Sequence, residues 1–210
     1  MKVLSITLVT DGASDRALIP IVEWLVGNKL TDYPFQVQLA QALPAHGEGL
    51  KSRISYALTH YACDILIVHR DAEGEAWGVR LEEINQATST LALDKTQAVA
   101  VIPIRMTEAW LLFDEMAVRR AAGNPAGKKV IKLSSLKKWE KEIDPKQLLI
   151  AALRDASELS GRRLAKFNAY EAKNRVAYLI RDFSQLNQLE SFGYFRKTLE
   201  SALELTTVKV

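Results

Sequence analysis

Only one cysteine, Cys63, occurs in 210 residues, and no stretch is long and apolar enough to span a membrane. A single cysteine excludes both an internal disulfide framework and a metal site built from several cysteines. The apolar run at the N-terminus is too short for a bilayer and ends at Asp11 without a signal-type cleavage site. We therefore expect a cytoplasmic protein of a reducing compartment, with no membrane partner.

Intrinsic disorder is not expected either, because 48% of the residues are hydrophobic and 25% are charged, as in ordinary globular proteins. The charge, however, is unevenly distributed. Residues 1–125 carry 11 Lys and Arg against 15 Asp and Glu, whereas residues 126–210 carry 17 against 10. This asymmetry favours an anion-binding half beside an acidic half, although Lys-rich helices with a solvated face would give the same counts.

Strand-like and helix-like patterns alternate along the first 124 residues. Short apolar or alternating runs predict strands, and apolar residues at helical spacing predict the helices between them. The strands are expected over residues 3–10, 35–41, 63–71 and 97–104, and the helices near residues 18–26, 50–61, 79–91 and 107–123. This order predicts an α/β fold with a mostly parallel sheet flanked by helices. The basic and mainly helical residues 125–210 are expected to pack on that core as an extension.

Acidic residues stand at the ends of two of the predicted strands. Asp11 comes directly after the first strand, Asp71 ends the third, and Glu73 follows two residues later. If these strands are neighbours, the three carboxylates share the crevice at the carboxyl ends of a parallel sheet. Carboxylates that lie close together repel one another unless a cation neutralises them, and Mg²⁺ and Mn²⁺ prefer such oxygen ligands. The spacing therefore favours a divalent metal site, with ordinary loop and cap residues as the alternative.

The order of several short motifs resembles the Toprim superfamily of topoisomerase–primase domains and overcoming-lysogenization-defect nucleases. Its first motif is matched by residues 9–15 (VTDGASD), which follow a strand, and its second by residues 71–73 (DAE). Two further stretches are similar to a little-characterised Toprim-like bacterial family, residues 103–111 (PIRMTEAWL) and the arginine-rich turn at residues 160–164 (SGRRL). The resemblance covers most of the chain and implies a Toprim-like core over residues 1–124 with a helical extension over residues 125–210.

The resemblance also implies roles for the acidic residues. Asp11 is the expected catalytic residue and a metal ligand, and Asp71 and Glu73 are the other expected ligands of Mg²⁺ or Mn²⁺. Asp15 and Glu108 are expected as additional acids. Members of the family usually have Glu at the position of Asp11 and Asp at the position of Glu73. Both exchanges keep the charge and change the reach of the carboxylate, so they affect the catalytic assignment more than the metal assignment.

Several residues near these acids allow two interpretations. Glu108 is either a further acid at the rim of the crevice or a residue that favours the positive first turn of a helix. Trp77 either stacks on a base or covers the edge of the sheet. Arg70 is expected to pair with Asp71 rather than to contact a phosphate, and Trp110 is expected in the core.

A basic cluster in the second half is the expected nucleic-acid-binding surface. It consists of Arg162, Arg163 and Lys166, and guanidinium forks suit phosphate groups particularly well. The lysines between residues 128 and 141 are expected to form a solvated helix face.

Together these features predict a Mg²⁺-dependent phosphodiester-processing protein, a nuclease that acts on DNA or RNA. Proteins of the resembled kind often stand beside ATPases in bacterial phage defence, so the resemblance implies an ATPase partner. Two alternatives stay open. One is a non-catalytic Toprim-like module that binds nucleic acid or a partner protein, and the other is an enzyme for a small phosphorylated substrate or nucleotide.

Overall fold

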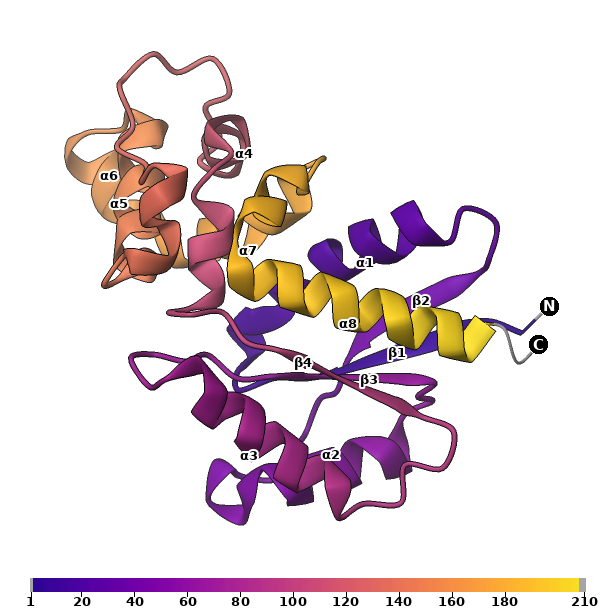
Figure 1. The fold of residues 1–210 in the computed structure, drawn as a ribbon. Coiled ribbons are helices and arrows are strands. Elements are labelled where there is room, and N and C mark those ends of the chain that lie inside the picture. The colour runs from indigo at the N-terminus through magenta and orange to yellow at the C-terminus, as the bar shows by residue number, and fades with distance from the viewer. Residues whose placement is uncertain (1, 208–210) are drawn as a thin grey trace.

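Four parallel strands form one sheet between two layers of helices (Figure 1). The structure is a computed structural model that describes residues 2–207. The strands lie in the order β2 (Phe35–Leu39), β1 (Leu4–Val9), β3 (Ile65–His69) and β4 (Gln97–Val101), and every neighbouring pair is parallel. The predicted α/β class, with a parallel sheet flanked by helices, is therefore confirmed.

The two central strands are buried on both faces, which explains their continuous apolar sequences. Along β3, Ile65 and Ile67 pack into one hydrophobic cluster, whereas Leu66 and Val68 pack into a second. This alternation follows from the pleat of an extended strand, whose successive side chains point to opposite faces. Each face of the sheet consequently has its own hydrophobic core.

Helices cover each face, and their arrangement defines a switch point in the sheet. The helix α1 (Leu18–Lys29) contributes to the first cluster, and α2 (Gly49–His60) and α3 (Trp77–Ser89) contribute to the second. The chain therefore leaves β1 toward one face of the sheet and leaves the neighbouring β3 toward the other. Open parallel sheets form their ligand crevice where the connections diverge in this way.

The chain after β4 is mainly helical and returns to the sheet. Its helices are α4 (Glu115–Ala121), α5 (Pro145–Ser157), α6 (Gly161–Lys166), α7 (Ala169–Leu179) and α8 (Glu190–Thr207). Figure 1 shows α8 in yellow alongside α1, and α8 contacts α1, β3 and β4. The second half therefore completes the cover of one sheet face. The domain boundary near residue 125 stays a prediction.

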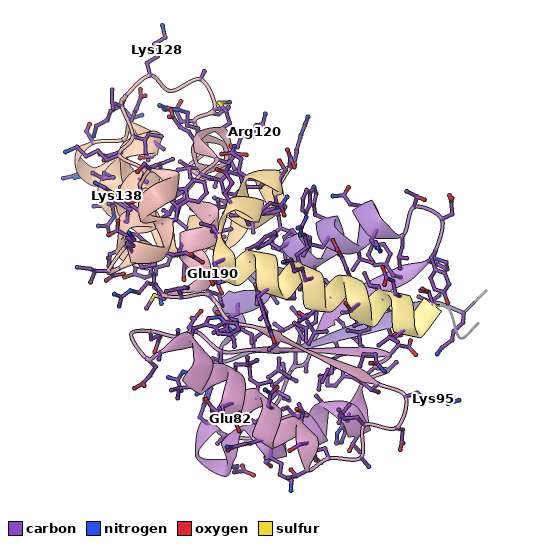
Figure 2. The ribbon with its side chains drawn as sticks, viewed as in Figure 1. Glu82, Lys95, Arg120, Lys128, Lys138 and Glu190 are labelled. Atoms are coloured by element: carbon purple, nitrogen blue, oxygen red, sulfur yellow. The ribbon has the colours of Figure 1, made fainter. Side chains whose placement is uncertain are left out.

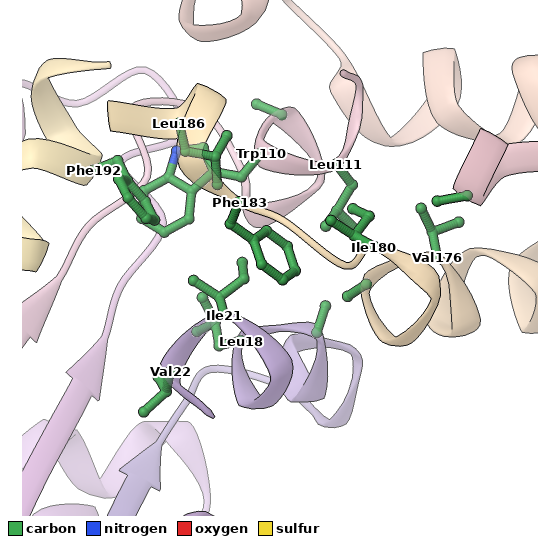
Figure 3. Close-up of a cluster of buried hydrophobic side chains, with 14 of the residues drawn as sticks. Leu18, Ile21, Val22, Trp110, Leu111, Val176, Ile180, Phe183, Leu186 and Phe192 are labelled. Atoms are coloured by element: carbon green, nitrogen blue, oxygen red, sulfur yellow. The ribbon is translucent and has the colours of Figure 1, made fainter. Parts of the chain in front are cut away.

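Trp110 lies in the hydrophobic cluster that joins the two halves (Figure 3). Its side chain is fully buried, and its ring centroid lies 5.3 Å from that of Phe192 and 6.4 Å from that of Phe195. Leu18 and Ile21 of α1 belong to the same cluster. The prediction that Trp110 packs in the core is confirmed.

The helix predicted over residues 107–123 is wrong as a single element. The structure has a 3-10 helix, Thr107–Leu111, followed by a break and then α4. The break occurs because Asp114 caps α4, with its Oδ1 accepting a hydrogen bond of 2.8 Å from the Ala117 N–H. The fourth strand, predicted to residue 104, ends earlier at Val101, since Pro103 has no N–H for the sheet.

Other short 3-10 helices join the longer elements. They are η1 (Ala13–Ala17), η2 (His46–Glu48), η4 (Leu136–Lys141) and η5 (Ser184–Gln188). Within residues 2–207, none of the helices combines the length and the apolar character that crossing a membrane requires.

Candidate functional site at the carboxyl edge

The ends of β1 and β3 bring Asp11 and Arg70 together. The Arg70 Nη1 donates a hydrogen bond of 2.6 Å to the Asp11 Oδ1, and its Nη2 lies 3.1 Å from the Glu83 Oε1 on α3. The predicted pairing of Arg70 with Asp71 is therefore wrong. Successive side chains of an extended segment point in opposite directions, so Arg70 reaches across to β1 while Asp71 turns toward His69.

Arg53 of α2 supplies a second guanidinium beside Asp11. It is only 5% exposed, and its Nη1 lies 3.7 Å from the Asp11 Oδ1. The Nη2 donates to the Thr10 carbonyl at 2.7 Å, and the Nη1 lies 2.9 Å from the His46 Nδ1. Burial lowers the pKa of the Arg53 guanidinium, whereas the charge of Asp11 opposes this effect. Asp11 thus lies between two cations that the fold holds in place.

Asp11 also lines a cavity of about 490 Å³ beyond the ends of β1 and β2. Arg53, His46 and the exposed Arg16 line it as well, and residues 39–45 form much of its remaining wall. For Arg16 no ion pair occurs within residues 2–207, so its guanidinium can serve a ligand. Cationic side chains around one carboxylate suit an anionic ligand with a phosphate group.

His69, the last residue of β3, is fully buried between two carboxylates. Its Nδ1 lies 3.4 Å from the Asp15 Oδ2, and its Nε2 lies 3.0 Å from the Asp71 Oδ1. Burial acts to lower the pKa of His69, but the contacts with Asp15 and Asp71 and their negative charges raise it to about 10. His69 is therefore an imidazolium at neutral pH. Its single positive charge lies beside both carboxylates and offsets one of their two negative charges from within the protein.

Asp71 is fixed by a second contact. The backbone N–H of Thr107 donates to its Oδ1 at 3.1 Å, and the Thr107 Oγ1 lies 3.1 Å from the His69 Nε2. Burial raises the pKa of Asp71, while the hydrogen bond and charge of His69 oppose the rise and the charges of Asp15 and Glu108 add to it. The chain just after β4 therefore helps to orient a carboxylate at the end of β3.

Asp15 and Glu73 differ sharply in their surroundings. Asp15 is 8% exposed, and its Oδ2 accepts a hydrogen bond of 2.8 Å from the Gly12 N–H at the start of η1. Glu73 is exposed and has a left-handed backbone with φ of 52°. Its N–H donates to the Arg105 carbonyl at 3.2 Å. The structure thus places Asp11, Asp15 and Asp71 around Arg70 and His69, with Glu73 on the surface.

The carboxylates in this arrangement do not fit a divalent metal. Among residues 2–207, no group of three or more His, Cys, Asp or Glu side chains lies where it could hold a metal ion. The negative charges that suggested a metal are instead compensated by Arg70 and Arg53 at Asp11, and by His69 at Asp71. A bound Mg²⁺ or Mn²⁺ would have to displace these cations, and its presence stays a prediction.

Glu108 forms a buried ion pair rather than part of an exposed rim. The Lys173 Nζ on α7 donates to the Glu108 Oε1 at 2.6 Å, and both residues are less than 9% exposed. The pair joins the segment after β4 to the helical second half. Glu108 therefore affects the site indirectly, because its ion pair holds the segment after β4 against α7.

The predicted nucleic-acid cluster lies apart from the acidic residues. Arg162, Arg163 and Lys166 are exposed on α6, and none of them forms an ion pair in the part of the chain that the structure describes. Figure 1 shows α6 in orange beside α5, well away from the carboxyl ends of the strands. These cations can meet a polymer that extends beyond the crevice, but the structure does not bring them to Asp11.

Three residues of this site were not predicted from the sequence: Arg53, His69 and Thr107. A signal existed for His69, because it is a polar residue at the end of an otherwise apolar strand. For Arg53 the sequence gave a weaker signal, namely its position next to the buried Ile54 on α2. Apart from the contact of His69 with Asp71, their partners come from segments far apart in the sequence, so spacing alone could not identify these contacts.

No protein-family model matches the chain, and no curated protein or solved structure does so either. The resemblance to Toprim proteins therefore stays a prediction that depends on the short motifs themselves.

Proposed function

We propose that the chain binds phosphate groups of nucleic acid in the cavity beside Asp11 and cleaves a phosphodiester bond there, as a nuclease. One observation carries this proposal: the Asp11 carboxylate lies between the guanidinium groups of Arg53 and Arg70. Asp11 and Arg53 both line the cavity, and Arg16 is exposed in it. An anionic substrate is attracted by the three arginines, and the carboxylate is the group that can accept a proton.

The charges assign different roles to these side chains. In the proposed reaction Asp11 accepts a proton from a water molecule as the oxygen of that water adds to phosphorus. The P–O ester bond then breaks, which leaves a phosphomonoester on one side and an alkoxide on the other. The alkoxide takes a proton from solvent and becomes a hydroxyl group, and Asp11 releases its proton to solvent. Arg16 and Arg53 hold the phosphate, and Arg70 orients Asp11 and offsets charge that develops on the phosphate oxygens. No step of this scheme passes through a metal ion.

The test compares Asp11→Asn with the wild type on plasmid DNA, single-stranded DNA and RNA. We expect the wild type to cleave at least one of these polymers and Asp11→Asn to lose about 100-fold or more of that rate, because the amide cannot accept the proton. Binding by Asp11→Asn should be unchanged or tighter, since the variant removes a negative charge beside the phosphate. Asp32→Asn, on an exposed loop, is the matched control.

Each polymer is assayed with Mg²⁺, with Mn²⁺ and with EDTA. Cleavage that persists in EDTA supports the role of the internal cations, and cleavage that needs a metal contradicts the present scheme while keeping the nuclease proposal. A lack of both binding and cleavage with all three polymers overturns the proposed function.

A second candidate is a non-catalytic module that binds nucleic acid or a partner protein. The observation in its favour is that Asp11, Asp71 and Asp15 each already contact a cation of the protein. Binding that survives EDTA without cleavage by either the wild type or Asp11→Asn supports the module. The third candidate, turnover of a small phosphorylated compound without polymer binding, is tested with mononucleotides in the same assay.

An ATPase partner in a bacterial defence system is a further part of the proposal, supported only by the motif resemblance. Affinity capture of the tagged chain from its native host tests it. Recovery of an ATPase in stoichiometric amount supports the partnership, and recovery of the chain alone contradicts it.

A further inference from the structure

A second pocket lies at the same edge of the sheet, on the β4 side. Its volume is about 220 Å³, and its walls are formed by Trp77, Ile104, Glu190, Ser191 and Tyr194. Trp77 begins α3 and Ile104 follows β4, while the other three belong to the first turns of α8. Figure 2 labels Glu190 at the start of α8, beside the segment that leaves β4.

The aromatic walls are fixed by contacts within the protein. The Trp77 Nε1 donates to the Ile102 carbonyl at 3.1 Å, and the Trp77 and Tyr194 rings meet edge to face with centroids 4.7 Å apart. The Ser191 hydroxyl donates to Glu140. These polar atoms of the wall are thus already satisfied, so a ligand meets mostly apolar ring surface. Glu190 lines the pocket and is exposed, so its carboxylate is accessible to a ligand.

The two pockets flank the Asp11–Arg70 pair. The cavity beside Asp11 lies over β1 and β2, and the aromatic pocket lies beyond β3 and β4. Adjacent strands are about 4.8 Å apart, so the two pairs of strands are separated by roughly two strand spacings, about 10 Å, along the edge of the sheet. One flexible ligand with an anionic part and a flat aromatic part can therefore reach both pockets across the ion pair.

We propose that the aromatic pocket receives a nucleobase that carries an amino group, from the polymer whose phosphate lies beside Asp11. This inference rests on the proposed function and adds base recognition to it. Aromatic side chains stack on any base, which supplies affinity without sequence preference. The preference comes from Glu190, because a carboxylate only accepts hydrogen bonds. It accepts from the amino group of cytosine, whereas thymine presents an N–H flanked by two carbonyl oxygens that a carboxylate repels.

Binding of single-stranded oligonucleotides of equal length tests the inference by fluorescence anisotropy. The probes are oligo(dC), oligo(dT) and an abasic phosphodiester chain. We expect the wild type to bind oligo(dC) roughly fivefold more tightly than oligo(dT), and the abasic chain most weakly. Tyr194→Ala should weaken oligo(dC) binding about tenfold and leave abasic binding unchanged. Tyr170→Ala, which truncates an exposed tyrosine on α7, is the matched control.

Glu190→Gln separates recognition from folding, because it changes an exposed side chain without altering its size. The amide also offers a donor, so the preference for oligo(dC) over oligo(dT) should shrink to about twofold or less. Equal effects of Tyr194→Ala on all three probes, or an unchanged preference in Glu190→Gln, overturn the base pocket while the phosphate site stands. Absence of binding to every probe, the abasic chain included, is instead a failure of the proposed function.

Discussion

The Nη1 of Arg70 lies 2.6 Å from the Oδ1 of Asp11, so an ion pair joins the ends of the two central strands. The side chains are 20% and 30% exposed, and the pair is therefore partly shielded from water. The sequence predicted that a metal ion would neutralise Asp11, and in the structure Arg70 and Arg53 lie beside this carboxylate. Replacing Arg70 therefore tests two things with one variant: the predicted binding of a metal ion at Asp11, and the contribution of the ion pair to stability.

Arg70→Ala should leave Arg53, at 3.7 Å, as the one guanidinium beside the Asp11 carboxylate, and the charge that is no longer compensated should raise the affinity of the chain for Mn²⁺. Wild type and Asp71→Ala are expected to give equal, weak heats on titration with Mn²⁺, because their carboxylates are compensated by internal cations. Arg70→Ala should give a larger heat. It should also lower the free energy of unfolding by about 1–3 kcal/mol, since Asp11 and Glu83 lose a charged donor.

The control for this titration is Arg80→Ala, which removes an arginine that pairs with the same Glu83 but not with Asp11. Its Mn²⁺ heats should match those of the wild type. A strong wild-type heat that Asp71→Ala abolishes would show that the carboxylates do gather around a metal, contrary to the arrangement described.

The raised pKa of His69 predicts a loss of stability at alkaline pH. The pKa is about 10 in the folded protein and about 6.5 in an unfolded chain, so the folded state binds the extra proton between these values. The contribution is fully present below pH 6.5 and is lost as the pH rises through 10. Its size is on the order of a few kcal/mol. The raised pKa of Asp71 has the opposite sign, because it costs stability once the pH exceeds the unfolded value of a carboxyl group.

Denaturant unfolding of the wild type and His69→Gln at pH 6, 8 and 10 measures this effect. The variant should be the less stable protein at pH 6, and the difference should shrink toward pH 10. His60→Gln, on the exposed end of α2, should follow the wild-type curve. Parallel curves for wild type and His69→Gln across this range would contradict an imidazolium at this position.

The buried pair of Glu108 and Lys173 should show strong coupling in a double-mutant cycle. Lys173→Met leaves a buried carboxylate without its cation, and we expect a loss of about 3–5 kcal/mol in the free energy of unfolding. Adding Glu108→Gln removes the charge and should recover most of that loss. Additive effects of the two changes would mean that the 2.6 Å ion pair contributes nothing to stability.

The sheet could be predicted because its signals are local. The apolar run of β3 and the β-branched run of β1 identify buried strands, and their alternation with helices gives a parallel sheet. The helix over residues 107–123 was predicted wrongly because apolar spacing continues through Asp114. At that position the capping geometry of a single side chain outweighs the periodic pattern.

The site was predicted only in part, for a different physical reason. Asp11 and Asp71 could be placed at the same edge of the sheet because they stand at the ends of neighbouring parallel strands. The partners of these acids could not be predicted in this way, because Arg53 comes from α2 and Thr107 from the segment after β4. The sequence indicated excess negative charge, and a metal was the simplest cation to assign. The internal cations that compensate this charge become visible only when distant segments are brought together.

The exposed cations on α6 form either a nucleic-acid-binding surface or a solvated helix face, and the salt dependence of binding distinguishes these two interpretations. Replacing Arg162, Arg163 and Lys166 together by alanine should reduce the log–log salt dependence of single-strand binding by about 0.7 for each phosphate that these side chains neutralise, or about 2 in total. Arg16→Ala should reduce the slope by about 0.7. Both sets of side chains are exposed, so folding should be preserved. Arg181→Ala, also exposed, is the control. A slope unchanged in the triple variant but reduced in Arg16→Ala would confine the polymer to the crevice, and the opposite result would place it on the helical half.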